Sequence, residues 1–296
     1  MTAEQLRAWL HGRPRVLDGA GAGELLHRGV AAAGRLWGVG ALLEAPGEVR
    51  RLHADYAAAG AEVLTALTFR VSPYALRRVG LEDRAAELAA LATRLAREGA
   101  AEAGREVLVL ASMTTLEDCY RPDLVPADEV LLKEHAATAA ILAAARPDGL
   151  LLETFNSIPE TLAAVDAAIA TGLPVIVSFA CREDGQLLSG EDAGLAAAAV
   201  SLPEVAAVGA NCTALKDMLP ALTAMAEATV LPLVAHANNA YFAEDAPHLR
   251  AEPTEPERYA RCALAWLATG ARLIGGCCGT TPEHVAAVAR ALARGR

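Results

Sequence analysis

Residues 149–180 read GLLLETFNSIPETLAAVDAAIATGLPVIVSFA and contain one full repeat of the pattern that decides the fold. The apolar runs GLLLET (149–154) and PVIVSFA (174–180) are typical of parallel strands that are buried on both faces. Between them lies an alanine-rich stretch that Ser157 and Glu160 introduce as a capping box. The segment therefore predicts a strand, a helix and a second strand.

The same alternation recurs along the chain and produces eight apolar runs in total. The other six are RVLDGA (15–20), AEVLTAL (61–67), EVLVLASM (106–113), VAAVGANC (205–212), PLVAHAN (232–238) and ARLIGGC (271–277). Helical patterns separate the runs, and Thr281-Pro282 places proline at the first position of the last helix. Eight strand–helix units within 296 residues predict an α/β fold, a single (β/α)8 TIM barrel.

We expect one domain over residues 1–296, in which residues 1–14 form an N-terminal helical lead-in. No linker, low-complexity tract or charge block marks a domain boundary. An open doubly wound sheet is the alternative architecture. It is less favoured because the first run is not followed by the Gly-x-Gly-x-x-Gly pattern of a dinucleotide-binding turn.

The composition argues against several classes of protein. A formal net charge of −10 disfavours a nucleic-acid or anionic-membrane surface, while 54% apolar residues can fill a large core. The six cysteines are few for this length and form no disulfide-rich pattern. We see no secretory signal, and the longest uncharged stretch, 228–243, contains Pro232 and His236, so it is not a membrane span. We therefore expect a cytoplasmic protein that acts on small molecules.

Reactive side chains stand at the carboxyl ends of five runs. These are Asp18, Glu153, Cys212, His236 with Asn238, and the pair Cys277–Cys278. In a parallel barrel the active site is built at this edge, so residues far apart in the sequence meet at one mouth. We therefore expect the three cysteines to face a common site.

Three thiolates favour a zinc site with one open position. Catalytic zinc commonly has three protein ligands, so Cys212, Cys277 and Cys278 would leave the fourth position to water or a substrate sulfur. Zinc lowers the pKa of a bound thiol, which suits alkyl transfer to sulfur better than hydrolysis. Adjacent residues of a regular strand point to opposite faces. We therefore expect the glycines around Cys277–Cys278 to let the backbone leave strand geometry and turn both sulfurs toward the mouth.

Other interpretations of these residues stay open. The GGCCG segment at 275–279 could be a tight turn with packed or disulfide-linked thiols, and a structural zinc site would require a fourth protein ligand. Asp18 and Glu153 could be structural hydrogen-bond acceptors, and His236 a hydrogen-bonded interior histidine. The remaining cysteines receive no role at the site, two of them as packing residues and the third in an irregular stretch: Cys181, Cys262 and Cys119.

The motifs at the strand ends resemble those of the homocysteine S-methyltransferase family. The matching segments are VLDGA (16–20), GAEVLTALTF (60–69), GLLLETFNSIPE (149–160), VSFACREDGQLLSG (177–190), VGANCT (208–213) and IGGCCGTTPEHV (274–285). The combination of NCT with GGCCGTTP is the most specific part. The resemblance implies a homocysteine-binding zinc barrel, as in cobalamin-dependent methionine synthase and betaine–homocysteine methyltransferase. Its implied reaction is methyl transfer to the thiolate of homocysteine, giving methionine.

The resemblance also implies roles for individual residues. The three cysteines at the strand ends would be the zinc ligands. Asp18 and Glu153 would bind the ammonium group of homocysteine. Backbone amides near Gly19 and Ala20 would receive its carboxylate. The two ends of a short aminothiol would thus be fixed.

The chain departs from the usual family pattern where a methyl donor would approach. The departures lie at 66–68, 111–115 and 236–239. They make Thr68, His236 and Asn238 candidate donor-side residues. We expect S-methylmethionine or S-adenosylmethionine, bound directly in the mouth, in preference to betaine or a corrinoid, because we expect no separate folate or cobalamin domain.

Two alternative functions stay open. The first is zinc-dependent methylation of another thiol or of a selenol. The second is a homocysteine-binding module that acts with a separate partner protein carrying the methyl group. Turnover with a free donor would separate an enzyme from a binding module.

Overall fold

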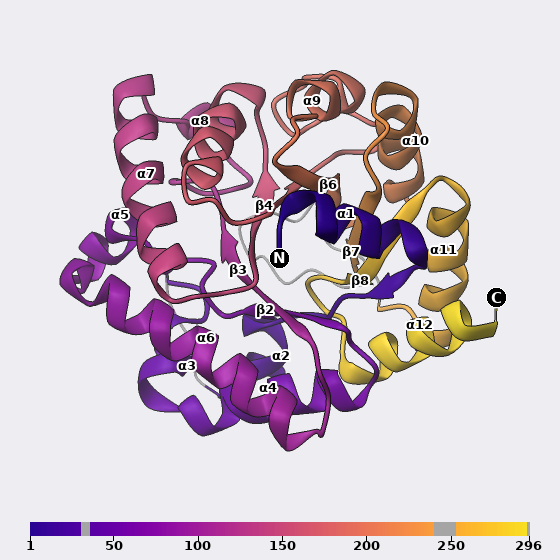
Figure 1. Ribbon diagram of the computed structural model, residues 1–296, viewed down its shortest axis with the longest axis horizontal. Coiled ribbons are helices and arrows are strands. Elements are labelled where there is room, and N and C mark those ends of the chain that lie inside the picture. Colours follow the sequence, from indigo (N-terminus) through magenta and orange to yellow (C-terminus); the bar gives the residue numbers. More distant parts are fainter. Residues whose placement is uncertain (31–35, 240–252, 295–296) are drawn as a thin grey trace.

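The computed structural model describes residues 1–30, 36–239 and 253–294, and in this part of the chain eight parallel strands form one barrel (Figure 1). Each predicted apolar run overlaps one strand, and β4 and β6 extend one and two residues beyond their runs: β1 (Arg15–Val16), β2 (Val63–Ala66), β3 (Leu108–Met113), β4 (Gly149–Phe155), β5 (Val175–Phe179), β6 (Val205–Ala214), β7 (Leu233–Asn238) and β8 (Ala271–Gly276). Hydrogen bonding joins them in the order β1-β8-β7-β6-β5-β4-β3-β2.

Hydrogen bonds between the first two strand regions close this barrel. The Glu62 amide donates to the Val16 carbonyl at 2.8 Å, and the Asp18 amide donates to the Val63 carbonyl at 3.1 Å. An open sheet would leave these groups at two separate edges. The (β/α)8 barrel prediction is therefore confirmed, and the doubly wound alternative is wrong.

Helices surround the barrel wall in Figure 1. Their bounds are α1 (Ala3–Gly12), α2 (Ala22–His27), α3 (Val39–Glu44), α4 (Pro46–Ala58), α5 (Pro73–Leu76), α6 (Ala85–Glu102), α7 (Asp128–Ala144), α8 (Ile158–Ile169), α9 (Ala193–Ala199), α10 (Met218–Ala228), α11 (Pro256–Ala268) and α12 (Pro282–Arg294). The last of them begins at the proline that the sequence predicted. No helix in the described ranges is long and apolar enough to cross a membrane.

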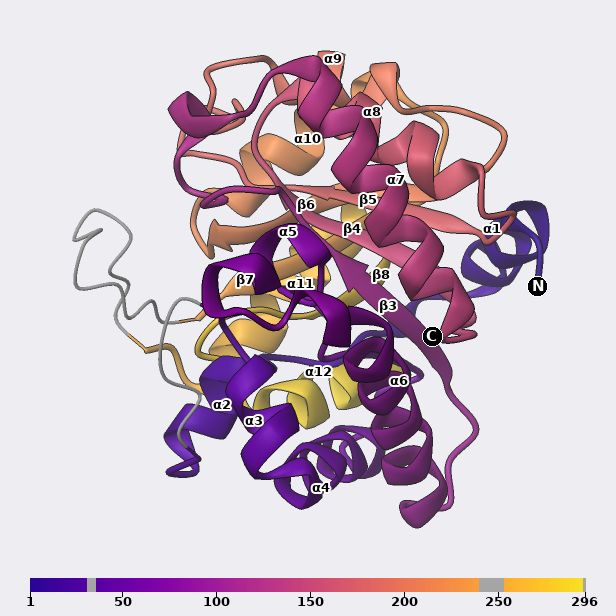
Figure 2. The ribbon, with the colours of Figure 1, turned by 90° about the vertical axis from the view of Figure 1, so that its left-hand side faces the viewer.

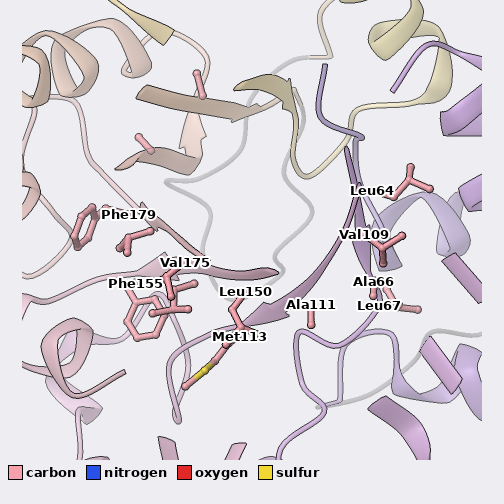
Figure 3. Close-up of a cluster of buried hydrophobic side chains, with 14 of the residues drawn as sticks. Leu64, Ala66, Leu67, Val109, Ala111, Met113, Leu150, Phe155, Val175 and Phe179 are labelled. Carbon is pink, nitrogen blue, oxygen red and sulfur yellow. The ribbon is translucent and has the colours of Figure 1, made fainter. Parts of the chain in front are cut away.

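Successive residues of a strand face opposite sides of the barrel wall, and both sides are apolar. Leu64 and Val109 belong to the cluster that packs between the strands and the helices, part of which is shown in Figure 3. Their neighbours Val63 and Leu110 belong to a separate cluster that fills the barrel interior. Because both faces of a strand are buried, the strands read as nearly continuous apolar runs.

Helix α1 closes the amino-terminal end of the barrel. Its Leu6 and Leu10 join the interior cluster. Arg7 donates through Nη2 to the carbonyls of Pro203 and Val205, both at 2.9 Å. Figure 2 shows this helix at one end of the barrel. The expected N-terminal lead-in thus contains a helix at the end opposite to the carboxyl ends of the strands.

The capping box predicted before α8 does not form. The helix begins at Ile158 with Ser157 at the N-cap position, but the Ser157 side chain makes no capping hydrogen bond. Glu160 instead accepts a hydrogen bond from the Leu116 amide at 2.8 Å, and Glu191 accepts one from the Ile158 amide at 2.9 Å. The amide of Leu116 and the carboxylate of Glu191, which come from two neighbouring loops, thus bond to the start of α8 in place of the capping box.

Candidate functional site

A layer of polar side chains lies above the apolar interior of the barrel. Ile176 of the interior cluster is followed two residues later by Ser178, and Val234 by His236. Positions i and i+2 of a strand point to the same face, so these polar side chains also point inward. By this alternation the layer comprises Thr65, Ser112, Glu153, Ser178, Asn211 and His236. The site therefore stands on a packed apolar floor, at the carboxyl ends of the strands.

Three cysteine sulfurs lie together at this end of the barrel. Cys212 lies near the end of β6, and Cys277 and Cys278 follow β8 directly. The Sγ atom of Cys212 lies 2.8 Å from that of Cys277 and 3.9 Å from that of Cys278. All three sulfurs lie within 4.8 Å of one another, and all six cysteines of the chain are free thiols. This group can hold one metal ion, and three protein ligands would leave a position for another.

The backbone leaves regular strand geometry on both sides of this cysteine group. Cys212 has a φ of 47°, in the left-handed region, where the pairing of β6 with β7 shifts its register. Gly279, directly after Cys278, has a φ of 76°. A non-glycine residue in the left-handed region costs of order 1–3 kcal/mol and is commonest at functional positions. The backbone at Cys212 is therefore held in an unfavourable conformation that brings its sulfur into the cysteine group.

The reason predicted for the glycines before Cys277 is wrong. Gly275 and Gly276 have no left-handed φ. A Cβ atom on Gly275 would meet the carbonyl oxygen of Asp18 at 2.5 Å, and one on Gly276 would collide with the side chain of Thr280. These glycines therefore allow the close approach of β8 to the first strand and to the following loop. Only Gly279 supplies the backbone freedom that the sequence suggested.

Strand β7 braces the loop that carries the paired cysteines. The Cys277 amide donates to the Ala237 carbonyl at 2.9 Å, and the Cys278 amide donates to Asn238 Oδ1 at 3.1 Å. The Asn239 amide donates to the Cys278 carbonyl at 2.8 Å. Asn238, a predicted donor-side residue, thus uses its side chain to hold the backbone of Cys278.

The crowded sulfurs do not hold their protons equally. Cys212 accepts hydrogen bonds from the thiols of Cys277 and Cys278, and these bonds place the pKa of Cys212 well below its usual value. Donating these bonds raises the pKa values of Cys277 and Cys278 well above their usual range. The side chains of Tyr120 and Thr154 also lower the pKa of Cys212. Cys212 is therefore the sulfur that is best stabilised as a thiolate.

Asp18 lies at the mouth with both carboxylate oxygens engaged. Oδ2 accepts from the Thr65 amide at 2.7 Å, and Oδ1 accepts from the Thr65 hydroxyl at 3.0 Å. Burial raises the pKa of Asp18 from 3.8 to about 7, although both bonds favour the ionised form. The carboxyl group is therefore fixed in place, and no cationic side chain of the described residues stabilises its ionised form.

Glu153, a member of the polar layer, provides the second carboxylate of the site. Its Oε1 accepts a hydrogen bond from the Ser112 hydroxyl, and its Oε2 lies 3.5 Å from Asn211 Nδ2. Burial raises the pKa of Glu153 to about 8, and the negative charges of Cys212 and Asp18 act in the same direction. Both carboxylates and the cysteine group therefore lie close enough for their charges to interact.

The predicted donor-side residues make internal hydrogen bonds. His236 Nε2 lies 3.1 Å from Ser178 Oγ, and burial lowers the pKa of His236 to about 4. The Thr68 hydroxyl donates to the Ser112 carbonyl at 2.8 Å. The imidazole is therefore neutral near pH 7, and the donor-side roles of His236 and Thr68 stay predictions.

The loop after the first strand packs against Thr280. A Cβ atom on Gly19 would meet Thr280 Oγ1 and the Tyr56 hydroxyl oxygen, each at 2.8 Å. The Ala20 amide donates to Thr280 Oγ1 at 3.1 Å. This amide already has an acceptor in the protein, and the binding of a substrate carboxylate by the backbone near Gly19 and Ala20 stays a prediction.

The other cysteines lie outside the group of three. Cys181 is buried, and burial raises its pKa to about 12, as expected for a packing residue. Cys262 is half-buried on α11. Cys119 is buried, yet its charge would interact with that of Cys212, so it lies nearer the site than the sequence indicated.

Sequence analysis missed the polar side chains that hold the predicted site residues. Thr65 bonds to Asp18, and Ser112 and Asn211 bond to Glu153. The signal that could have found these three was the period of two within each run. A polar residue two or four positions after an inward apolar residue shares its face.

Comparisons with known proteins agree on one family. The profile of the family described as homocysteine S-methyltransferase matches residues 15–292. The homocysteine S-methyltransferase of Escherichia coli (strain K12) is 33% identical, with 92% of this chain and 93% of that protein covered. The selenocysteine methyltransferase of Astragalus bisulcatus is 25% identical, with 100% of this chain and 98% of that protein covered. The metallated form of the homocysteine methyltransferase MmuM from Escherichia coli has a TM-score of 0.84 and 31% identity, with 96% of this chain and 99% of that chain covered.

Proposed function

We propose, because this chain belongs to the homocysteine S-methyltransferase family, that it moves a methyl group from a small donor to the sulfur of homocysteine and forms methionine. The chain is an enzyme of this family, and the metallated relative supports a metal at the cysteine group. The observation that carries the proposal is the group of Cys212, Cys277 and Cys278 beside the carboxylates of Asp18 and Glu153.

We assign the metal as Zn²⁺, held by Cys212, Cys277 and Cys278. Three sulfur donors within 4.8 Å of one another fit zinc, which prefers thiolate ligands in tetrahedral sites. When bound, zinc lowers the pKa of a coordinated substrate thiol, so that the thiol ionises near neutral pH. The free thiol of homocysteine, taken to resemble that of cysteine, would be only a few per cent ionised at pH 7.

The carboxylates of Asp18 and Glu153 would hold the ammonium group of homocysteine. Their pKa values, about 7 and about 8, are raised chiefly by burial, so a bound cation would stabilise their ionised forms. Thr65 and Ser112 fix the two carboxylates through hydrogen bonds. With its ammonium group held at one end, the substrate would present its sulfur to the cysteine group. The two carboxylates would thus contribute by orienting the substrate, and not by making its sulfur more reactive.

The residues near the mouth favour a donor whose leaving group needs no proton. S-methylmethionine and S-adenosylmethionine are sulfonium ions, and each leaves as a neutral thioether after methyl transfer. His236 is neutral at pH 7 because burial lowers its pKa to about 4, so it is a poor general acid there. Thr68, His236 and Asn238 would border the donor, and their internal hydrogen bonds would shape its pocket.

Methionine formation by the purified, zinc-loaded protein tests this proposal. Homocysteine is offered with one donor at a time: S-methylmethionine, S-adenosylmethionine, betaine or methylcobalamin. We expect turnover with a sulfonium donor and its loss in Cys212→Ser. A protein that binds one zinc ion but turns over no donor would contradict the enzyme proposal and favour a binding module that needs a partner.

A second acceptor is favoured by one specific observation. The Astragalus bisulcatus relative, which aligns over the whole of this chain, is a selenocysteine methyltransferase. The same assay with selenocysteine in place of homocysteine measures this alternative. A higher kcat/KM for the selenol would replace homocysteine as the proposed acceptor, whereas a lower value would retain it.

A further inference from the structure

The loop that carries the paired cysteines is bonded to Asn239, the residue that follows β7. The Asn239 amide donates to the carbonyl of Cys278 at 2.8 Å, and its side-chain Nδ2 donates to the carbonyl of Gly279 at 3.1 Å. Asn239 is buried, and its Oδ1 accepts a hydrogen bond from the amide of Thr254 at 2.8 Å. Thr254 lies 15 positions further along the chain, shortly before α11. One side chain therefore joins the cysteine loop to a distant segment of the sequence.

His284, in the first turn of α12, binds the same residue, Thr254. Its Nδ1 lies 3.2 Å from the amide nitrogen of Thr281, which can only donate, so Nδ1 accepts and the ring proton lies on Nε2. Nε2 lies 2.8 Å from the carbonyl oxygen of Thr254 and therefore donates to it. The same nitrogen lies 3.0 Å from Nδ2 of Asn239. The amide and the carbonyl of Thr254 are thus bonded to two buried side chains that are also in contact with each other.

The aromatic ring of Tyr259 fixes the orientation of this imidazole. The rings of Tyr259 and His284 are nearly perpendicular, at 87°, and their centroids lie 5.7 Å apart. Tyr259 is fully buried on α11, and its hydroxyl oxygen lies 3.0 Å from the carbonyl oxygen of Ala237 and 2.9 Å from that of Gly275. Because Ala237 belongs to β7 and Gly275 to β8, the imidazole packs against a side chain that is bonded to both strands next to the cysteine loop.

We propose that His284 and Asn239 are positioning residues of the metal centre. Through Thr254 and the loop backbone they hold Cys278 where its sulfur can share an ion with that of Cys212. The proposal rests on the metal site proposed above. Asn239 bonds to the backbone of Cys278, so these residues act on the place of the ligand and not on the charge of its sulfur. Partners that orient metal ligands from outside the coordination sphere typically contribute roughly 10- to 100-fold to metal affinity.

The bond between His284 and Thr281 is also a helix cap, and the experiment has to separate this local role from the proposed one. His284 is the third residue of α12, and an acceptor there bonds to the amide of the residue before the helix, as in a capping box. The same arrangement occurs at α1, at the opposite end of the barrel, where Gln5 Oε1 accepts from the Thr2 amide at 2.8 Å. Gln5→Ala therefore removes an equivalent cap far from the cysteine group.

His284→Ala tests the proposal, and Gln5→Ala is the matched control. Zinc affinity is measured by competition with a chromogenic chelator, and the sulfur-to-cobalt charge-transfer band is recorded after Co²⁺ substitution. We expect His284→Ala to weaken zinc binding about tenfold and to shift the cobalt band, whereas Gln5→Ala should change neither. His284→Gln should restore both, because glutamine supplies an acceptor for the Thr281 amide and a donor for the Thr254 carbonyl.

Asn239→Ala tests the same contacts independently, also where His284→Ala fails to fold. It removes the side-chain bonds to Thr254 and Gly279 and keeps the backbone amide that donates to Cys278. We again expect about tenfold weaker zinc binding. Because both side chains act through one segment, the double substitution should weaken binding by less than the product of the two single effects.

Three results would overturn the inference. The first is an unchanged zinc affinity and cobalt band in folded His284→Ala or Asn239→Ala. The second is an equal loss of zinc affinity in Gln5→Ala, which would reduce the effect to helix capping. The third is a loss in His284→Gln as large as that in His284→Ala, which would exclude the hydrogen bonds as its cause. Absence of zinc binding by the unsubstituted protein would instead contradict the proposed metal site itself.

Discussion

The side-chain nitrogen Nδ2 of Asn211 lies 3.5 Å from Oε2 of Glu153, so a fully buried amide adjoins one of the two carboxylates of the site. The same nitrogen lies 4.0 Å from Cys277 Sγ and 2.8 Å from Thr154 Oγ1. Its Oδ1 accepts a hydrogen bond from the Thr154 amide at 2.8 Å. The side chain of Asn211 therefore lies between the carboxylate of Glu153 and the cysteine group and maintains the spacing between them.

Replacement of this amide should affect substrate binding as well as stability. We expect Asn211→Ala to lower kcat/KM for homocysteine roughly 10- to 100-fold. It should lower the free energy of unfolding by about 1–3 kcal/mol, because the buried Thr154 amide loses its acceptor. Steady-state kinetics and denaturant unfolding measure the two effects. A loss of stability with an unchanged KM for homocysteine would show that Asn211 supports the strands and not the substrate position.

The three grouped cysteines should differ sharply from the remaining ones in metal content. We expect Cys212→Ser to lose the bound zinc and all turnover, because one of three protein ligands is removed. Cys262→Ser is the matched control, since Cys262 is half-buried on α11 and lies outside the group. Elemental analysis after gel filtration gives the zinc content of each variant. Retained zinc in Cys212→Ser would remove Cys212 from the ligand set.

The carboxyl groups of Asp18 and Glu153 should make the protein without metal or substrate less stable as the pH rises. In the unfolded chain Asp18 ionises near its ordinary pKa of 3.8, but in the folded protein its pKa is about 7. Between these values the folded state keeps a proton that the unfolded state releases, so unfolding is favoured as pH rises. The stabilising contribution is complete below pH 3.8 and is lost as the pH rises through about 7. Glu153, with a pKa of about 8, acts in the same direction.

Thermal unfolding of Asp18→Asn between about pH 5 and 8 checks this expectation. Asparagine keeps the size of the side chain and cannot ionise, so we expect the Tm of the variant to fall less with rising pH than that of the unsubstituted protein. Identical slopes for the two proteins would contradict a raised pKa at Asp18. The variant should also show a higher KM for homocysteine, because one partner of the ammonium group is neutral.

Gly19 should tolerate no side chain. We expect Gly19→Ala to destabilise the protein by about 1–3 kcal/mol, because a new Cβ displaces packed neighbours. These neighbours are Thr280 and Tyr56, each 2.8 Å from the added atom. The exposed Gly47, in the first turn of α4, has no atom within 4 Å of an added Cβ. Gly47→Ala should therefore be neutral or stabilise by about 0.5–1 kcal/mol. Equal changes in Tm for both variants would contradict the packing argument.

The sequence by itself determined the barrel and the convergence of its reactive residues. Runs such as GLLLET begin with consecutive apolar residues because both faces of β4 are buried there, so the strands could be located without any knowledge of their partners. Parallel strands share one polarity, so residues at their carboxyl ends meet at one edge. The meeting of Cys212 with Cys277 followed from this topology, despite their separation along the chain.

Only the tertiary structure decided which polar groups hold the site. Glu160 bonds to the Leu116 amide rather than to its own helix, and Gly275 is small because the first strand passes close by. Asn211 reaches Glu153 and Thr154 across strands that local patterns do not connect. The physical reason is that hydrogen bonds and steric contacts act over a few ångströms between distant segments. The hydrophobic pattern of a segment, by contrast, depends only on the surroundings of its own two faces, so it can be read from that segment alone.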